Sequence, residues 1–580
     1  MSGFRTEWDT APNERYDIWT VTNGGEVVPG IVSPFMATTF NRFDAWGLRR
    51  LMRSYPSGGE VVVSDAPVGN FFGIRAGRLC LNLGFTAAGM SVLDPDIAQA
   101  TLQQFFTGAD QLDRFIVRVP EKRRQRSYAA ATAQREAAPA ALAALQEELY
   151  AERATDRFAR DRRLPLGPAW KRFLTLTRAN TDILNTHYVV STAAGEFQVR
   201  LAGVIMMGGG DPMAVVGLVS GMGEVESSKP AIALYDLAKL ARRHPDVATD
   251  LVEGSAADAT ARMRAGATAG WRAFARAFDE FSFRYGFRAQ GEADPTNADW
   301  AEEPAFALSS VRAMLAVADD ESPRAQIRRA AAGRRRLEKT VRAGLAPELR
   351  PAFDQVLVAA QHFTRLRELS KATWVLAARR TRAPYLAVAD ALVSAGVLQQ
   401  ADDLKYLVYD EVAALAAGAT VAGVRASVTR RRRQARQAEE YALPDIWFGD
   451  CRPTKRHVLR DVTVLQGLGV STGPGPVTGR VHIILDALSA AEHDIEPGAV
   501  LVAPYTDTPW TPLFIPAGGV VVETGGILSH AATVAREFGI PAVVMVKEAT
   551  RILHDGDVVT VDGAAGTVTV VERAPALVAV

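Results

Sequence analysis

The feature that most constrains the fold of this chain is a long stretch of helical spacing. From about residue 121 to 440 the composition turns to Ala, Arg, Leu and Glu, with apolar residues at three- and four-residue intervals. This spacing is typical of helices that bury one face, and proline and glycine fall at the ends of the segments rather than in their middles. The predicted helices are 139–161, 230–245, 257–283, 325–345, 351–380 and 384–396.

The two flanks of this stretch have other patterns. Residues 1–120 scatter Gly, Pro and aromatic residues among short apolar runs, which predicts irregular chain with some strand and short helices. The last 120 residues carry short β-branched runs bounded by Gly, Pro or Asp, as buried strands do. These runs are 481–485, 499–503, 519–523, 542–546, 558–561 and 567–571.

One helix is predicted among these strands, from about His530 to Phe538. Ser529 is a good N-cap residue, Gly539 stands where a left-handed residue closes a helix, and Pro541 prevents continuation. The end of the chain is therefore a compact α/β module.

We expect a multidomain α+β protein: a large, mainly α-helical body at 1–445, with 1–120 as a mixed α/β subregion, then a linker at 446–461 and a module at 462–580. The arginine run Thr429–Arg433 precedes the linker. It suits either a nucleic-acid or phosphate patch or a solvated helix face, and we favour the solvated face because Glu439 and Glu440 lie nearby.

Composition narrows the class of protein. Lys+Arg 66 against Asp+Glu 65 leaves a formal charge of +1, so no net field favours nucleic acid or an anionic membrane as a partner. Two cysteines, Cys80 and Cys451, make no disulfide framework, and no apolar run reaches the ~18 residues that span a bilayer. The polar N-terminus is unlike a signal peptide, so we expect a cytoplasmic protein.

Chemistry concentrates where the last predicted helix begins. His530 falls on its first turn, where unpaired backbone N–H groups and the positive end of the helix dipole keep an imidazole neutral and nucleophilic. The same donors stabilise an anion such as phosphate, and Gly525 and Gly526 let a ligand approach the backbone. A capping or core histidine is the alternative, but the context Gly-Gly-x-x-Ser-His-Ala-Ala favours a histidine that carries a phosphoryl group.

Residues 520–547 resemble the phosphohistidine swivel domain of the phosphoenolpyruvate-utilising enzymes, a family that includes rifampin phosphotransferase and phenylphosphate synthase. The resemblance continues through 468–479, 508–514 and 555–563. It implies a C-terminal swivelling β/β/α phosphohistidine domain in which His530 is phosphorylated. The implied phosphate-binding residues are Thr524, Gly525, Gly526, Ser529 and Arg536, although Arg536 also suits an ordinary surface ion pair with Glu537.

The body is similar to the substrate-binding part of rifampin phosphotransferase, through 23–35, 77–82, 285–304 and 366–371. Arg367 and Lys371 are four residues apart on a predicted helix, so both cations project from one face. Spacing alone favours a solvated basic face, whereas the resemblance implies that the pair contacts the transferred phosphate. One departure is Phe287, which stands where the family usually has histidine, so the acceptor chemistry is expected to differ.

A loop in the body places two carboxylates close together. Glu292 and Asp294 are suited to orienting or deprotonating an acceptor hydroxyl or to binding a metal. They are equally suited to pairing with Arg288 to fix the loop. We predict Arg288, Glu292 and Asp294 as substrate-binding residues and assign no metal to this chain.

The donor of the phosphoryl group is expected elsewhere. We find no Walker A sequence, no room for a barrel of roughly 250 residues after the module, and no room before the body's opening motif for an ATP-grasp domain. A separate ATP-grasp subunit, using ATP and Mg²⁺, is therefore the expected partner, as in phenylphosphate synthase.

The predicted function is a phosphotransferase component that carries a phosphoryl group on His530 from that partner to a phenolic or alcoholic hydroxyl of a small-molecule acceptor. By the resemblance, the other products would be AMP and inorganic phosphate. The first alternative is an ATP-dependent ligase in which phosphohistidine activates a carboxylate. The second is a non-catalytic relative that keeps the fold.

Overall fold

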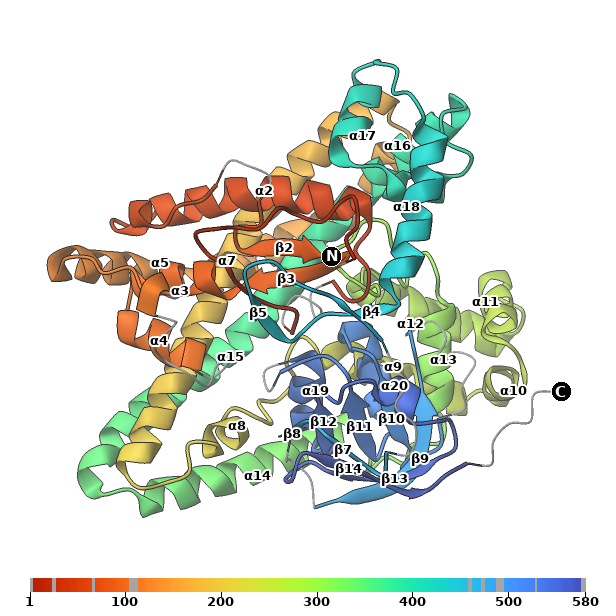
Figure 1. Cartoon of the computed structure of the whole chain (residues 1–580). Helices are drawn as coiled ribbons and strands as arrows, with labels where there is room; N and C mark the ends of the chain where they lie inside the picture. The colour runs from red at the N-terminus through yellow and green to blue at the C-terminus, as the bar shows by residue number, and fades with distance from the viewer. Residues whose placement is uncertain are drawn as a thin grey trace. The chain divides into compact units, whose positions relative to one another are not determined.

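A computed structural model describes residues 4–22, 28–64, 68–103, 113–456, 462–470, 475–486, 495–526 and 529–574. The chain, drawn as a ribbon in Figure 1, divides into two compact units, each with its own hydrophobic core. Unit 1 comprises Met1–Gly203, Glu292–Thr296 and Val358–Arg456, and unit 2 comprises Val204–Gly291, Asn297–Leu357 and His457–Val580. The predicted domain limits at 445 and 462 remain predictions.

Unit 1 is mainly helical. Its helices are α2 (Pro34–Arg53), α3 (Leu83–Ser91), α4 (Pro95–Gln103), α5 (Glu121–Arg153), α6 (Arg157–Asp161), α7 (Leu166–Met207), α15 (Arg350–Ala378), α16 (Arg382–Ser394), α17 (Tyr409–Ala416) and α18 (Val424–Ala438). Its 3₁₀ turns are η1 (Gly58–Glu60), η3 (Asp113–Phe115), η5 (Arg379–Thr381) and η6 (Ala401–Tyr406). The last residues of α7 and the first residues of α15 belong to unit 2.

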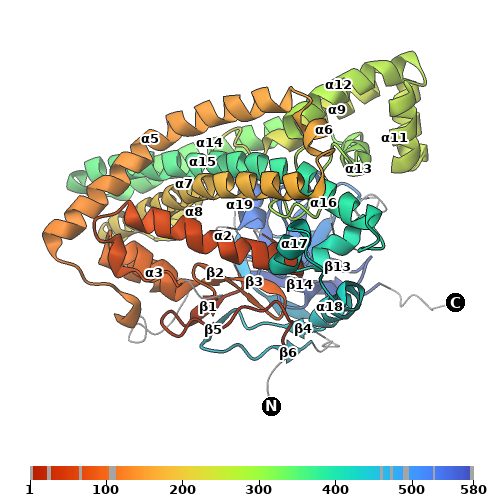
Figure 2. The ribbon, with the colours of Figure 1, turned by 90° about the horizontal axis from the view of Figure 1, so that it is seen from above.

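Three long helices, α5, α7 and α15, lie alongside one another in unit 1 (Figure 2). Ala138 and Leu142 of α5 pack against Val190 of α7 and Leu366 of α15. The predicted helix 139–161 was wrong at both ends, because α5 begins at Glu121, contains Pro139 and ends at Arg153. Pro139 lacks the N–H of one helical hydrogen bond, while Ala138 and Leu142 on either side of it are buried.

Three strands from the first 82 residues and one strand from residues 446–448 form a small antiparallel sheet. Its order is β2 (Phe72–Arg75), β3 (Arg78–Asn82), β1 (Ile18–Thr20), β5 (Ile446–Phe448). The first part of the predicted linker is therefore a strand rather than free chain, because Trp447 is buried beside Trp19, Cys80 and Cys451. A two-stranded ladder of β4 (Tyr441–Ala442) and β6 (Thr454–Lys455) follows. Both cysteines are free thiols.

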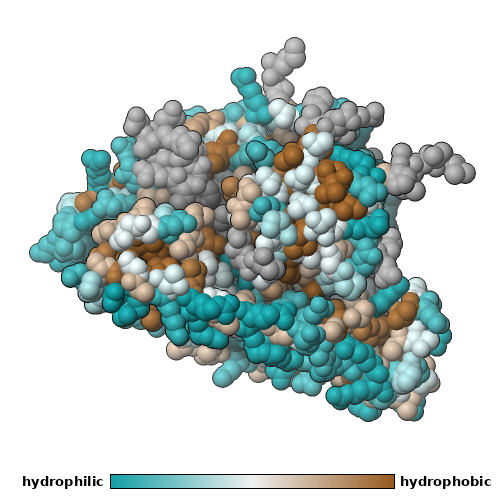
Figure 3. Space-filling model, turned by 90° about the horizontal axis from the view of Figure 1, so that it is seen from below, coloured by the Kyte–Doolittle hydropathy of each residue, from teal (hydrophilic) through white to brown (hydrophobic). Residues whose placement is uncertain are grey.

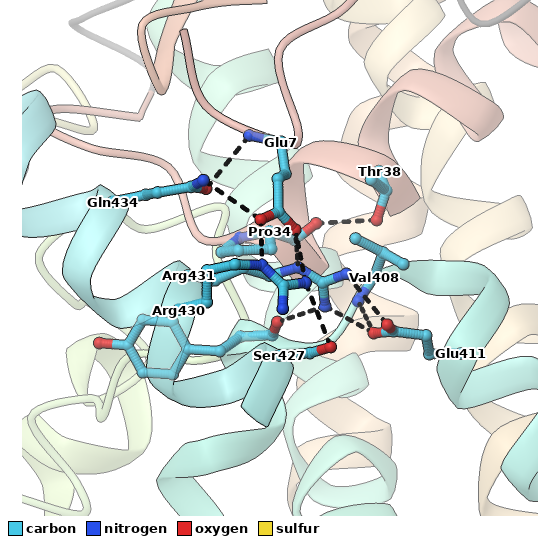
Figure 4. Close-up of polar contacts among 10 residues, drawn as sticks. Glu7, Pro34, Thr38, Val408, Glu411, Ser427, Arg430, Arg431 and Gln434 are labelled. Atoms are coloured by element: carbon cyan, nitrogen blue, oxygen red, sulfur yellow. Dashed lines mark hydrogen bonds and ion pairs between the residues drawn. The ribbon is translucent and has the colours of Figure 1, made fainter. Parts of the chain in front are cut away.

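The arginine run of α18 is not simply a solvated face, which corrects the prediction for it. Arg431 is 6% exposed, and its guanidinium pairs with Glu411 at 2.6 Å and with Glu7 at 3.2 Å. Arg430 also pairs with Glu7, so this carboxylate lies between two arginines (Figure 4). These ion pairs attach the N-terminal segment to α18.

Unit 2 begins with a group of helices. They are α8 (Ala214–Leu218), α9 (Lys229–Arg242), α10 (Pro245–Glu253), α11 (Ala256–Ala265), α12 (Ala269–Tyr285), α13 (Ala305–Met314) and α14 (Pro323–Gly344), followed by the turn η4 (Pro347–Leu349). The single helix predicted at 257–283 was wrong: Gly266, at φ 57°, ends α11, and the Thr268 hydroxyl accepts from Trp271 N to begin α12.

The C-terminal module is an eight-stranded sheet in the order β7-β14-β13-β9-β10-β11-β12-β8. Strands β9 to β12 are parallel to one another, and the others pair antiparallel. The strands are β7 (Val464–Gln466), β8 (Leu468–Val470), β9 (Val477–Ile483), β10 (Val500–Ala503), β11 (Gly519–Val522), β12 (Ala542–Val544), β13 (Val558–Asp562) and β14 (Thr567–Glu572). The six predicted strands are confirmed within two residues at each end, except that β9 begins four residues earlier than predicted. Strands β7 and β8 were not predicted.

Between the strands lie η8 (Thr508–Phe514), α19 (His530–Phe538) and α20 (Ala549–Ile552). Helix α19 has the bounds that its caps predicted. Within unit 2 it packs against α14, and one hydrophobic cluster runs from α9 and α12 to α19 and the sheet. The fold class is as predicted: a large helical region followed by a β/β/α module.

The face drawn in Figure 3 mixes hydrophilic residues with separate hydrophobic patches. Among the described residues, no helix is both long and apolar enough to cross a bilayer.

Candidate functional site

The start of α19 is built by local rules. Buried strand β11 ends at Val522, and Gly525 adopts φ 129°, a value that favours glycine. The Ser529 hydroxyl accepts from Ala532 N at 3.2 Å and caps the helix, while Gly539 closes it at φ 72°. Residues 527–528 lie outside the described chain.

His530 is the first residue of α19 and is 7% exposed. Its Nε2 lies 3.2 Å from the Thr511 hydroxyl, which comes from η8 and is fully buried. An imidazole at a helix N-terminus can attack phosphorus, and the positive end of the helix dipole stabilises the bound anion. Thr511 lies in the quoted segment 508–514, but sequence reasoning gave it no role.

The other predicted phosphate-binding residues of the turn lie just before α19. The backbone N–H of Thr524 donates to Pro504 O at 3.1 Å, and Gly526 O accepts from Ser529 N at 3.0 Å. The Thr524 side chain is half-buried. The structure therefore brings Thr524, Gly525, Gly526 and Ser529 to one turn next to His530.

Arg536 and Glu537 are not a surface ion pair. They are 5% and 3% exposed, and the Arg536 guanidinium donates to the Thr533 hydroxyl at 3.4 Å. The Glu537 carboxylate accepts from Met222 N at 2.9 Å. Burial of α19 inside unit 2 is the reason for the difference, and it places Glu537 in a contact that holds the module to the helices.

The predicted cations Arg367 and Lys371 lie on α15 in unit 1, with His187 of α7 facing them. Arg367 pairs with Glu368 at 3.0 Å. The His187 Nδ1 lies 2.9 Å from the Ser370 hydroxyl, and its ring stacks on Trp374. Burial, and then the charges of Arg367 and Lys371, lower the pKa of His187 to about 3. Sequence reasoning missed His187, because nothing local pairs it with residues 180 positions away.

Trp374 also lines a small aromatic pocket in unit 1. The pocket has a volume of about 50 Å³ and is bounded by α2, α7 and α15, with Phe35, Phe43 and Phe173 in its wall. Two buried polar atoms of the wall, Thr39 Oγ1 and Asp44 Oδ1, have no hydrogen-bond partner among the described residues. Burial raises the pKa of Asp44 to about 7. An apolar pocket with a few polar groups is a common small-molecule site.

The carboxylates of the loop are buried. Asp294, 4% exposed, accepts from Thr296 N at 2.8 Å, and its carbonyl oxygen accepts from Arg379 at 3.4 Å. Burial raises the pKa of Asp294. Glu292 is equally buried and belongs to unit 1, whereas Arg288 belongs to unit 2.

Arg288 and Phe287 are buried beside each other, with the guanidinium 4.9 Å from the ring centroid. Phe287 thus fills its position as a packed apolar residue. Among the described residues, no group of three or more His, Cys, Asp or Glu side chains is arranged to hold a metal ion.

Comparison with known proteins matches two parts of the chain. A family model for the fourth domain of rifampicin phosphotransferase matches residues 187–368, and one for the mobile domain of PEP-utilising enzymes matches residues 495–566. The first match begins at His187 and includes Arg367, and the second includes His530. The chain therefore carries a mobile domain of the PEP-utilising type together with a rifampicin phosphotransferase fourth domain.

Relatives that match just over half of the chain point the same way. A rifampicin phosphotransferase of a Streptomyces species is 33% identical over 359 residues, which cover 59% of this chain and 39% of that protein. A second, from Streptomyces sviceus, is 30% identical over 360 residues, covering 59% and 40%. The uncharacterized phosphotransferase YvkC of Bacillus subtilis is 31% identical over 321 residues, covering 52% and 37%. The chain spans about two fifths of the length of these relatives.

Proposed function

We propose that this chain is a phosphotransferase component in which His530 carries a phosphoryl group from an ATP-grasp partner to a hydroxyl of a small molecule. The observation that carries the proposal is His530 on the first turn of α19, inside the segment that matches the mobile domain. The relatives named as phosphotransferases support the same reaction class.

The carrier half of the reaction takes place on α19. A ring nitrogen of His530 forms a bond to the β-phosphorus of ATP while the bond from that phosphorus to the α-phosphate oxygen breaks and AMP leaves; water then releases the γ-phosphate as inorganic phosphate. The positive end of the α19 dipole stabilises the charge of the phosphoryl group that stays on the ring. Gly525 leaves the backbone open to the oxygens of that group. In this proposal ATP and Mg²⁺ bind to the partner, and no metal is assigned to the chain itself.

The acceptor half of the reaction takes place in unit 1. Arg367 and Lys371 supply fixed positive charge where the equatorial oxygens of a transferring phosphoryl group gather charge. The aromatic pocket beside Trp374 holds an apolar part of the acceptor, and Asp44 and Thr39 accept a hydrogen bond from it. A volume of about 50 Å³ admits a small terminal group rather than a large ring system.

The module moves between the two halves. His530 is 7% exposed, so the packing that covers the ring has to open before a donor reaches it. The contact of Glu537 with Met222 N and the packing of α19 on α14 are the interactions that such a movement breaks.

The test is labelling with ATP that carries ³²P at the β-position, in the presence of an ATP-grasp protein encoded beside this gene. We expect an acid-labile, base-stable label on the wild-type chain and none on His530→Ala. His554→Ala is the matched control, because His554 lies on the surface of the same module, with a side chain 71% exposed. Equal labelling of His530→Ala and wild type would rule the proposal out, and a product without phosphorus would favour the ligase.

A further inference from the structure

A histidine outside the swivel module lies at the acceptor side of the proposed reaction. His187 comes from the middle of α7 and faces α15, where Arg367 and Lys371 are one turn apart. Ser370 and Trp374 of the same helix hold the imidazole, one by a 2.9 Å contact to Nδ1 and the other by a stack at 6.4 Å between ring centroids. The ring is therefore fixed on two sides.

The hydrogen bonds favour one tautomer of the His187 ring. The Ser370 hydroxyl donates to Arg367 O at 2.9 Å, so its oxygen is left to accept. His187 Nδ1 then donates to Ser370 Oγ, and Nε2 keeps its lone pair. The one described partner near Nε2 is the Ser191 hydroxyl, which is 3.4 Å away and at the long limit for a hydrogen bond. Nε2 is thus available as a proton acceptor.

The charges around His187 make this nitrogen sensitive to phosphate. Burial of the His187 ring and the charges of the two cations of α15 together lower its pKa to about 3. The other neighbours of the ring, Ser191, Ser370 and Trp374, are uncharged. Lys371 has no ion-pair partner among the described residues, and Arg367 has Glu368. A phosphoryl group bound by the two cations offsets their charge, and the basicity of the imidazole then rises.

We propose that His187 Nε2 is the base that takes the proton from the acceptor hydroxyl during phosphoryl transfer, an inference that rests on the proposed function. The bond between phosphorus and the His530 nitrogen breaks, and its electron pair returns to that nitrogen. The acceptor oxygen forms the new bond to phosphorus while its proton moves to Nε2. The proton then passes through solvent to the His530 ring, which restores both histidines.

The first experiment does not depend on the carrier histidine. NMR of the full chain with ¹⁵N-labelled histidine follows the ring of His187 against pH, with and without inorganic phosphate. We expect the pKa of His187 to rise by about 1 to 3 when phosphate is saturating, and to rise without phosphate in Lys371→Met. Arg365→Met, which removes an exposed cation of the same helix, leaves it unchanged. A titration that phosphate does not alter overturns the inference.

The second experiment separates a base from a positioning residue. His530 is first phosphorylated by its partner or by phosphoramidate. The total rate at which the phosphoryl group then leaves His530, by transfer to phenol and by hydrolysis, is measured in the presence of phenol. His187→Asn keeps a donor for Ser370, and His187→Gln keeps a polar atom near Nε2, but neither takes up a proton. We expect both to slow the loss about 100-fold or more, and to abolish the rise of the rate with pH.

The matched control is His362→Gln, an exposed histidine on α15, which keeps the wild-type rate. A His187→Gln variant as fast as wild type would leave His187 a positioning residue only and contradict the inference. Failure of His530 to accept a phosphoryl group in any variant would instead count against the proposed function. Equal melting temperatures of the variants establish that the fold is intact.

Discussion

Arg367 and Lys371 differ in how their charges are balanced. Arg367 pairs with Glu368 at 3.0 Å, whereas Lys371 has no ion-pair partner in the described part of the chain. An uncompensated cation that is half-buried is costly unless an anion joins it. Lys371 is therefore the residue whose charge is most available to a phosphoryl group.

For Lys371 we predict that Lys371→Met slows transfer from phospho-His530 to the acceptor about 100-fold, because one fixed charge at the transition state is lost. Labelling of His530 by the partner stays at the wild-type level, since Lys371 acts in the second step only. Single-turnover kinetics of both steps measure this, with Arg365→Met as the control. A loss of labelling in Lys371→Met would place the residue on the wrong side of the reaction.

The burial of Asp44 makes the free energy of unfolding depend on pH. Its pKa rises from 3.8 to about 7, mainly through burial, so the folded state holds a proton that the unfolded chain releases above pH 4. A raised carboxyl pKa means that stability is greatest at low pH and falls as pH rises from about 4 to 7. Three pKa units correspond to about 4 kcal/mol.

We therefore predict that Asp44→Asn removes this decline. Urea unfolding of unit 1, followed by tryptophan fluorescence, should give wild-type midpoints that fall between pH 4 and 7 and level off above. The asparagine variant should stay level across the same range. Parallel pH profiles for the two proteins would show that Asp44 ionises normally and that water reaches the pocket wall.

At the scale of elements, α19 combines structural and chemical demands in its first turn. The Ser529 hydroxyl caps the helix, so a phosphate-binding role for it shares the oxygen that accepts from Ala532 N. The two roles respond differently to substitution. An N-cap needs an acceptor oxygen of any charge, whereas a phosphoryl group is repelled by a carboxylate.

We predict that Ser529→Ala destabilises the module by about 1 kcal/mol and that Ser529→Thr restores it. Ser529→Asp keeps the cap and the stability but loses labelling of His530, because its charge opposes the phosphoryl group. Thermal unfolding and labelling of the same three variants measure the two roles. Full labelling of Ser529→Asp would exclude Ser529 from the phosphoryl site.

Helix α18 is held by charge rather than by a large apolar face. Arg431 connects the carboxylates of Glu7 and Glu411 while almost fully buried (Figure 4). We predict that Arg431→Met costs about 2 kcal/mol, because it leaves the half-buried Glu411 without its charged hydrogen-bond partner, whereas Glu7 keeps Arg430. Arg433→Met, which removes an exposed arginine of the same helix, stays within about 0.5 kcal/mol. Equal melting temperatures for the two variants would show that the network adds nothing.

At the scale of the whole molecule, sequence predicted what local signals determine. The caps Ser529 and Gly539 define both ends of the nine-residue helix α19. The β-branched runs define six strands of the module. The length of α5 and the break at Gly266 depend on packing or on a single turn, so periodicity misjudged them. His187 was not predictable, because it meets Arg367 only when α7 packs on α15.

The division of labour between two units is the central claim: one carries the phosphoryl group, and the other receives it. The chain should therefore hold the group after the donor is gone. The most direct measurement is a pulse–chase, in which the chain is labelled from β-³²P ATP, separated from ATP and partner, and then given a cell extract of small molecules.

We predict that the label leaves His530 and appears in one small molecule as an acid-stable phosphate ester, in a 1:1 ratio to the labelled chain. Arg367→Met and Lys371→Met should keep the label on His530. Label that is lost only as inorganic phosphate, at the same rate in wild type and both variants, would contradict the account.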